Sequence, residues 1–312
     1  MDAKRTPDER FSDLPDFPYT PHYVDDMPGY EGLRMAFLDE GPKDAPVFLC
    51  LHGEPSWSFL YRKMIPVFLE AGARVIAPDL FGFGRSDKPS SQADYTYTFH
   101  RSSLLALVER LNLQDITLVC QDWGGILGLS LPMEDPARWS RLLVMNTGLP
   151  FEPESSVVAE DLARPADERK TGFGVWHAIS QRTDDMDVGR ILNMGSGQKL
   201  TEAEIAAYDA PFPDKTYKAG AIQFPLLVPF SESQPGYSIG RKAIAFWEND
   251  WNGQSFMAIG AADPVLGPKA MDRLRASIKG CPEPMIIEDG GHFVQEWGDA
   301  IAREALKAFG DA

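Results

Sequence analysis

The stretch that decides the fold is Leu118-Val119-Cys120-Gln121-Asp122-Trp123-Gly124-Gly125-Ile126. Its apolar first half predicts a buried strand, and the glycines of its second half predict a tight turn that opens a helix. Asp122 stands on that turn, where the small residues that follow allow the strand and the helix to approach closely. An aspartate in this place is either an exposed nucleophile or a cap for the helix that follows.

Other apolar runs bounded by Gly, Pro or Asp recur along the chain. Near-continuous runs of this length are typical of buried parallel strands, and the stretches between them have helical periodicity. The alternation predicts an α/β protein, a mostly parallel doubly wound sheet covered by helices. Strands are expected at residues 47–51, 74–77, 116–120, 142–145, 256–259 and 285–287, and helices at 58–71, 101–111, 271–278 and 300–309.

The alternation breaks between residues 150 and 229, where Pro, Gly, charged and aromatic residues mix without a strand pattern. It resumes at Phe256. We therefore expect a helical cap, residues 150–229, inserted into a main domain formed by residues 1–149 and 230–312.

A second segment, His52-Gly53-Glu54-Pro55, follows the predicted strand 47–51 directly. In a sheet whose nucleophile lies on a strand-to-helix turn, this loop supplies one backbone N–H to an oxyanion hole, and the residue after the nucleophile supplies the other. The sequence therefore predicts that the N–H groups of Glu54 and Trp123 form the oxyanion hole. His52 belongs to the turn and is expected to be structural.

Two further residues follow in chain order. Asp263 lies just after the predicted strand 256–259, and His292 lies after the predicted strand 285–287. The order nucleophile, acid, histidine is that of α/β hydrolases. Together with Asp122 these residues predict a catalytic triad on an α/β-hydrolase fold.

A carboxylate nucleophile implies a particular chemistry. Asp122 is ionised at neutral pH without a base, so it can attack an sp3 carbon and form an alkyl ester. His292 is then free to act as the general base that activates water against the ester, and Asp263 orients its imidazole. The scheme requires no metal and no organic cofactor.

Composition limits the possible partners. The chain has 312 residues and a formal net charge of −16, which should repel nucleic acids and anionic membrane surfaces. Its first residues, MDAKRTPDERFSD, contain no apolar run for a signal peptide or a membrane span. The three cysteines, Cys50, Cys120 and Cys281, suggest no disulfide framework. We expect a cytoplasmic monomer.

These segments resemble those of the haloalkane dehalogenases, and of the subfamily I members whose catalytic acid is an aspartate after the cap. The resemblance spans nearly the whole chain and weakens in the cap. It implies a small apolar halogenated substrate that reacts with water, and a halide ion bound by the indole N–H groups of Trp123 and Trp176. It also suggests apolar pocket residues, namely Phe173, Phe224 and Leu266.

Two alternatives remain open from the sequence. Epoxide hydrolases share the aspartate nucleophile but protonate the leaving alkoxide with paired cap tyrosines, for which Tyr208 and Tyr217 are available. A non-catalytic, ligand-binding homologue would keep the fold without the chemistry. In the cap, the charged residues 167–171 look like an insertion that could alter the pocket.

Overall fold

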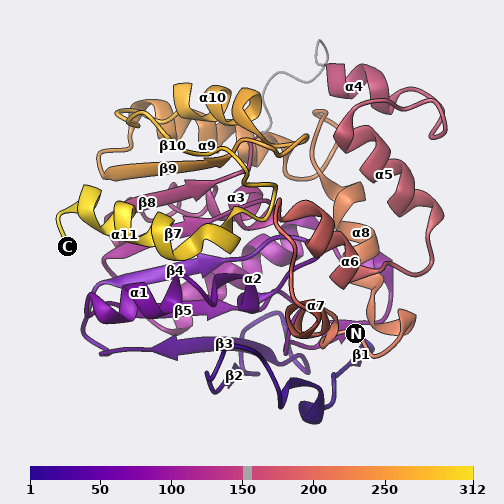
Figure 1. The fold of residues 1–312 in the computed structure, drawn as a ribbon, viewed down its shortest axis with the longest axis horizontal. Helices are drawn as coiled ribbons and strands as arrows, with labels where there is room; N and C mark the ends of the chain where they lie inside the picture. The colour runs from indigo at the N-terminus through magenta and orange to yellow at the C-terminus, as the bar shows by residue number, and fades with distance from the viewer. Residues whose placement is uncertain (150–156, 312) are drawn as a thin grey trace.

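The computed structural model describes residues 1–149 and 157–311 and is built around an eight-stranded sheet (Figure 1). The strand order is β10-β9-β8-β7-β4-β5-β3-β2, and neighbouring strands from β5 to β10 are parallel. The strands are β2 (His22–Val24), β3 (Met35–Glu40), β4 (Val47–Leu51), β5 (Arg74–Pro78), β7 (Ile116–Cys120), β8 (Trp139–Met145), β9 (Gln254–Gly260) and β10 (Met285–Ile287). The predicted parallel sheet is confirmed.

The antiparallel edge of the sheet was not predicted. β3 pairs antiparallel with both β5 and β2, and a separate two-stranded pair joins β1 (Ala3–Lys4) to β6 (Lys88–Pro89). The outermost strand β2 is exposed along most of its length, so it lacks the continuous apolar run that marks the central strands.

Helices cover both faces of the sheet. Figure 1 shows α1 and α11 in front of it and α2 and α3 behind it. The helices that cover the sheet are α1 (Ile65–Glu70), α2 (Tyr97–Arg110), α3 (Trp123–Gly128), α9 (Tyr237–Asn249), α10 (Pro268–Ala276) and α11 (Gly298–Phe309). Short 3-10 helices are η1 (Asp8–Phe11), η2 (Ser58–Tyr61), η3 (Gln92–Asp94), η4 (Pro136–Arg138), η5 (Lys215–Tyr217) and η6 (Val294–Trp297).

The helix predicted over residues 58–71 is two shorter ones, η2 and α1. Pro66 is the reason, because proline lacks an N–H and is tolerated only in the first turn of a helix. It stands at the second position of α1, where no intrahelical donor is lost.

Along the chain, the cap helices follow β8 and precede α9. In space, they lie beyond the carboxyl ends of the parallel strands (Figure 1). They are α4 (Val157–Leu162), α5 (Gly172–Arg182), α6 (Val188–Gly195), α7 (Glu202–Asp209) and α8 (Ala219–Leu227). The predicted boundary at residue 150 lies outside the described residues, and the one at 229 falls between α8 and α9. Across residues 1–149 and 157–311, every helix is too short or too polar to cross a membrane.

Candidate active site

Asp122 occupies a strained turn between β7 and α3. Its φ of 50° and ψ of −127° are unusual for a residue with a side chain. The close approach depends on glycine, since a Cβ on Gly124 would stand 1.9 Å from the carbonyl oxygen of Leu51. The Asp122 side chain does not cap α3; its Oδ1 instead accepts a hydrogen bond from the Glu54 N–H at 2.8 Å. The capping interpretation of this aspartate is therefore wrong.

His292 lies between two carboxylates. Its Nε2 is 3.4 Å from Asp122 Oδ2, and its Nδ1 is 2.8 Å from Asp263 Oδ2. The three residues come from loops after β7, β9 and β10, whose carboxyl ends meet at one edge of the parallel sheet. The order found in the sequence thus becomes a hydrogen-bonded chain from Asp263 to the nucleophile candidate.

The two carboxylates control the charge of the imidazole. Burial alone would lower the pKa of His292, but the charge of Asp263 and the hydrogen bonds with Asp122 and Asp263 outweigh burial and raise it to about 10. Burial would raise the pKa of Asp263, yet His292 and a hydrogen bond from Asn146 lower it to about 2. With Asp122 ionised, His292 is therefore held as the imidazolium.

Two side chains that support this arrangement were missed by the sequence analysis. Asn146 Nδ2 donates to Asp263 Oδ2 at 3.0 Å and to the Gly260 carbonyl at 3.1 Å. Gln121 Nε2 donates to the His292 carbonyl at 3.0 Å and lies 3.0 Å from its Nε2. Asn146 could have been found, because it directly follows β8 at the same edge of the sheet.

Two tryptophans adjoin the Asp122 and Glu54 pair, Trp123 along the chain and Trp176 from the cap. Trp123 is 2% exposed. Because it begins α3, its backbone N–H is among those that have no partner inside the helix. Trp176 on α5 interacts with the Glu54 carboxyl. Burial raises the pKa of that carboxyl well above its usual range, the Asp122 charge adds to the rise, and the Trp176 side chain opposes it.

The predicted pocket residues differ in their surroundings. Phe224 on α8 is fully buried, with its ring centroid 4.8 Å from that of Trp123. Leu266 lies beside Gly148, next to the site's edge of the sheet. Phe173 packs 4.9 Å from the Phe230 ring. These contacts place Phe224 directly against a site tryptophan.

The tyrosines required for an epoxide hydrolase are engaged elsewhere. The Tyr208 hydroxyl is buried between Glu296 and Arg62, to which it is hydrogen-bonded at 2.9 and 3.1 Å. The Tyr217 ring lies under the Lys4 ammonium, 5.1 Å away. No described contact joins either tyrosine to Asp122.

His52 is fully buried, and its two ring nitrogens contact the Gly53 carbonyl and the Leu80 N–H, each at 2.9 Å, which confirms a structural role. Residues 167–171 form an ordered turn that leads into α5. There Thr171 accepts the Gly174 N–H, and Asp161 accepts hydrogen bonds from the Lys170 N–H and from the N–H and hydroxyl groups of Thr171.

The chain is similar to known proteins of one class. Residues 46–299 match the family model for the alpha/beta hydrolase fold, so the chain belongs to the α/β hydrolases. The chain is 45% identical to a haloalkane dehalogenase of Psychrobacter cryohalolentis, over 97% of this chain and 96% of that protein. A haloalkane dehalogenase of Mycolicibacterium paratuberculosis is 43% identical, over 95% and 94% of the two chains.

A solved structure agrees with these relatives. The tetrameric structure of the haloalkane dehalogenase DpaA from Paraglaciecola agarilytica superposes with a TM-score of 0.91, at 51% identity and over 98% of each chain. Within the α/β hydrolases, the protein belongs to the haloalkane dehalogenase family.

Proposed function

We propose that the protein is a hydrolase that converts haloalkanes into a primary alcohol and a halide ion, through a covalent ester on Asp122. The observation that carries this proposal is the chain from Asp263 through His292 to Asp122, whose carboxylate also accepts the Glu54 N–H. Membership of the haloalkane dehalogenase family supports carbon–halogen bonds as the target.

In the first step an Asp122 oxygen attacks the carbon that bears the halogen. The new C–O bond forms as the carbon–halogen bond breaks, and the electron pair leaves with the halide. A halide is a weak base, so it needs hydrogen-bond donors and no proton. The indole N–H groups of Trp123 and Trp176 are donors only and suit this role.

In the second step water attacks the Cγ of the ester while His292 takes its proton. Negative charge grows on the ester carbonyl oxygen, where the N–H groups of Glu54 and Trp123 stabilise it. The intermediate collapses as the bond between the Asp122 Cγ and the alkoxy oxygen breaks. The alkoxide takes its proton from His292 and leaves as the alcohol, and the proton that remains on the Asp122 carboxyl group is released to solvent, which restores the carboxylate. Ester formation removes the Asp122 charge that helps to raise the pKa of His292, so the imidazolium releases its proton to solvent more readily and the neutral imidazole is available as the base.

The test compares substitutions at two positions. Asp122→Ala should lower halide release from short bromo- and chloroalkanes by at least about 10³-fold, because the nucleophile is lost. His292→Gln should form the ester without hydrolysing it, which mass spectrometry would detect as one alkyl group on the Asp122 peptide. The control is His22→Gln, which changes a histidine on the exposed strand β2.

Two results would contradict the proposal. One is halide release that persists in Asp122→Ala, and the other is an unshifted mass after His292→Gln has met the substrate. Hydrolysis of styrene oxide, measured on the same preparation, separates an epoxide hydrolase from a dehalogenase. A wild-type protein that is inactive in both assays would favour the non-catalytic homologue.

We also propose the finer assignments that depend on this function. Asp263, placed after β9, supports subfamily I, and the helical segment supports a cap at residues 150–229 within a main domain of 1–149 and 230–312. Phe173, Phe224 and Leu266 are proposed as pocket residues. We propose a cytoplasmic monomer, for which the three free thiols and the net charge of −16 are the support.

A further inference from the structure

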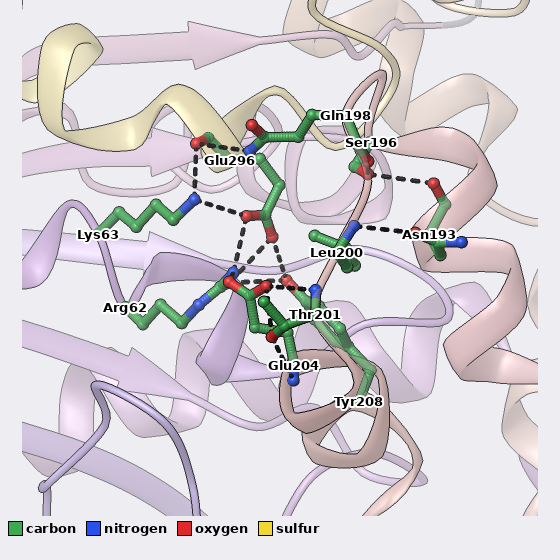
Figure 2. A network of polar contacts seen from close by, with 10 residues as sticks. All are labelled: Arg62, Lys63, Asn193, Ser196, Gln198, Leu200, Thr201, Glu204, Tyr208 and Glu296. Atoms are coloured by element: carbon green, nitrogen blue, oxygen red, sulfur yellow. Dashed lines mark hydrogen bonds and ion pairs between the residues drawn. The ribbon is translucent and has the colours of Figure 1, made fainter.

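A buried carboxylate lies four residues after the catalytic histidine candidate, outside the reaction centre. The Glu296 side chain on η6 is fully buried and is surrounded by cationic and hydroxyl donors (Figure 2). Arg62 donates to both carboxylate oxygens, at 2.9 and 2.7 Å. Tyr208 donates to Oε1 at 2.9 Å, and Lys63 lies 3.0 Å from Oε2. We refer to Arg62, Lys63, Tyr208 and Glu296 as the Glu296 cluster.

The cluster joins the main domain to the cap. Arg62 follows η2 in the main domain, and its Nη2 also reaches Glu204 Oε1 on cap helix α7 at 2.6 Å. Glu204 in turn accepts the Thr201 N–H and completes the capping box at the start of α7. Gln198, in the cap loop before α7, donates to the Glu296 carbonyl at 3.1 Å, as Figure 2 shows.

The cap also holds the backbone on both sides of His292. The Gly291 N–H donates to the Ser196 carbonyl, and the Phe293 N–H donates to the Gly195 carbonyl, both at 3.2 Å. The approach is close, since a Cβ on Gly291 would stand 2.3 Å from the Gly195 carbonyl oxygen. The loop that carries His292 is therefore fixed by cap backbone at residues 291 and 293 and by the Glu296 cluster at residue 296.

Stability alone does not explain so many donors on one buried carboxylate. A buried ion pair contributes little more stability than well-packed apolar residues of the same volume, because desolvation opposes the electrostatic attraction. What the charged and bidentate contacts do supply is a fixed geometry. The geometry fixed here is the direction of the 291–297 segment, and with it the direction of the His292 ring.

We propose that Glu296 is a positioning residue for the second step of the reaction, and that Arg62 and Tyr208 hold it for that purpose. This inference rests on the proposed function. The first step needs only Asp122 and the halide donors, whereas the second needs His292, water and the ester carbon in line. A displacement of about 1 Å can cost roughly 100-fold in such a step. The cluster therefore acts selectively on ester hydrolysis.

The experiment measures the two steps separately in Glu296→Gln. Glutamine keeps the shape, but it removes the charge and turns an NH₂ group toward the Arg62 and Lys63 donors. Rapid quench with a bromoalkane that the wild-type enzyme turns over, followed by intact-mass spectrometry, gives the rates of ester formation and loss. We expect formation within about 3-fold of wild type and hydrolysis slowed about 10- to 100-fold, so that alkylated enzyme accumulates.

A milder variant covers the case in which Glu296→Gln does not fold. Tyr208→Phe removes one hydroxyl from the cluster and should shift the balance in the same direction, by a smaller factor of about 3 to 10. The matched control is Asp39→Asn. It breaks another largely buried ion pair, between Asp39 and Arg74 at the antiparallel edge of the sheet, and should leave both rates unchanged.

The outcomes distinguish a positioning role of Glu296 from a simple loss of stability. Unchanged hydrolysis, or equal slowing of both steps, in the folded variants would overturn the positioning role. Asp39→Asn slowing hydrolysis selectively would do the same, since loss of stability would then suffice. His292→Gln, run alongside, tests the reaction scheme separately: if it traps no ester, the proposed function fails, whatever the Glu296 variants do.

Discussion

At the scale of single residues, the His292–Asp263 pair predicts how stability depends on pH. The pKa of His292 is raised from 6.5 to about 10, so its contribution is full below pH 6.5 and is lost as the pH rises toward 10. The pKa of Asp263 is lowered from 3.8 to about 2, so its contribution is full above pH 3.8 and is lost as the pH falls toward 2. The pair should stabilise the fold most between pH 3.8 and 6.5.

The measurement is the difference in free energy of unfolding between wild type and His292→Gln, from urea denaturation at a series of pH values. We expect a plateau over the stated window and a decline on both sides of it. His22→Gln, on the exposed strand β2, is the matched histidine control. A difference that grows as the pH rises from 6.5 to 10 would contradict the assigned direction of the His292 shift.

The sequence predicted the residues that follow strands, and missed those whose partners are distant. Asp122, Asp263 and His292 each stand in a turn after an apolar run, which is a local pattern. Glu296 has its main partner, Arg62, 234 residues away in the chain, and nothing near either residue indicates the contact. Tyr208 shows the same limit, because its type suggested an electrophile whereas its position makes it a support for Glu296.

At the scale of elements, the position of α5 predicts how halide binding depends on a single aspartate. Asp161 accepts hydrogen bonds from Lys170 N–H, Thr171 N–H and Thr171 Oγ1, and Thr171 caps the helix that carries Trp176. Asp161→Asn replaces one acceptor oxygen by a donor. Loss of one such buried hydrogen bond costs about 1 kcal/mol, so bromide should bind roughly 5-fold more weakly if α5 holds Trp176 in place.

Quenching of intrinsic fluorescence by bromide gives the affinity. Trp176→Phe serves as the reference for a lost donor, and Asp184→Asn is the control, since it breaks an exposed cap ion pair with Lys215. Bromide affinity that is the same in Asp161→Asn and in wild type would show that the turn at residues 167–171 does not position Trp176.

Elements were predicted well where burial alone sets the pattern. Every expected strand lies within a real one, from β4 to β10. Strands buried on both faces, such as β4 and β7, need continuous apolar runs, which makes them easy to find in the sequence. The cap was recognised only by the absence of that pattern. The short polar turns between its helices, such as residues 167–171, are fixed by side-chain contacts that composition does not reveal.

At the scale of the whole molecule, charge and exposed apolar surface bear on assembly. Each chain carries −16, so a tetramer would bring four such charges together and needs a substantial apolar interface to compensate. Within residues 1–149 and 157–311, the exposed large apolar side chains are Met1, Tyr23, Val175, Ile179, Met194 and Ile286. Of these, Val175 and Ile179 lie one turn apart on α5.

We therefore expect light scattering after size exclusion to give the mass of one chain, 34.6 kDa, at low and at moderate ionic strength. The tetrameric structure of the relative from Paraglaciecola agarilytica defines the opposing result, a mass about four times larger. If the mass of a tetramer is found, the double variant Val175→Lys with Ile179→Lys tests whether α5 forms the interface. It should then give the monomer, because the tetramer would leave two buried ammonium groups in each chain unpaired. Salt, by screening the repulsion between chains, should then favour the tetramer.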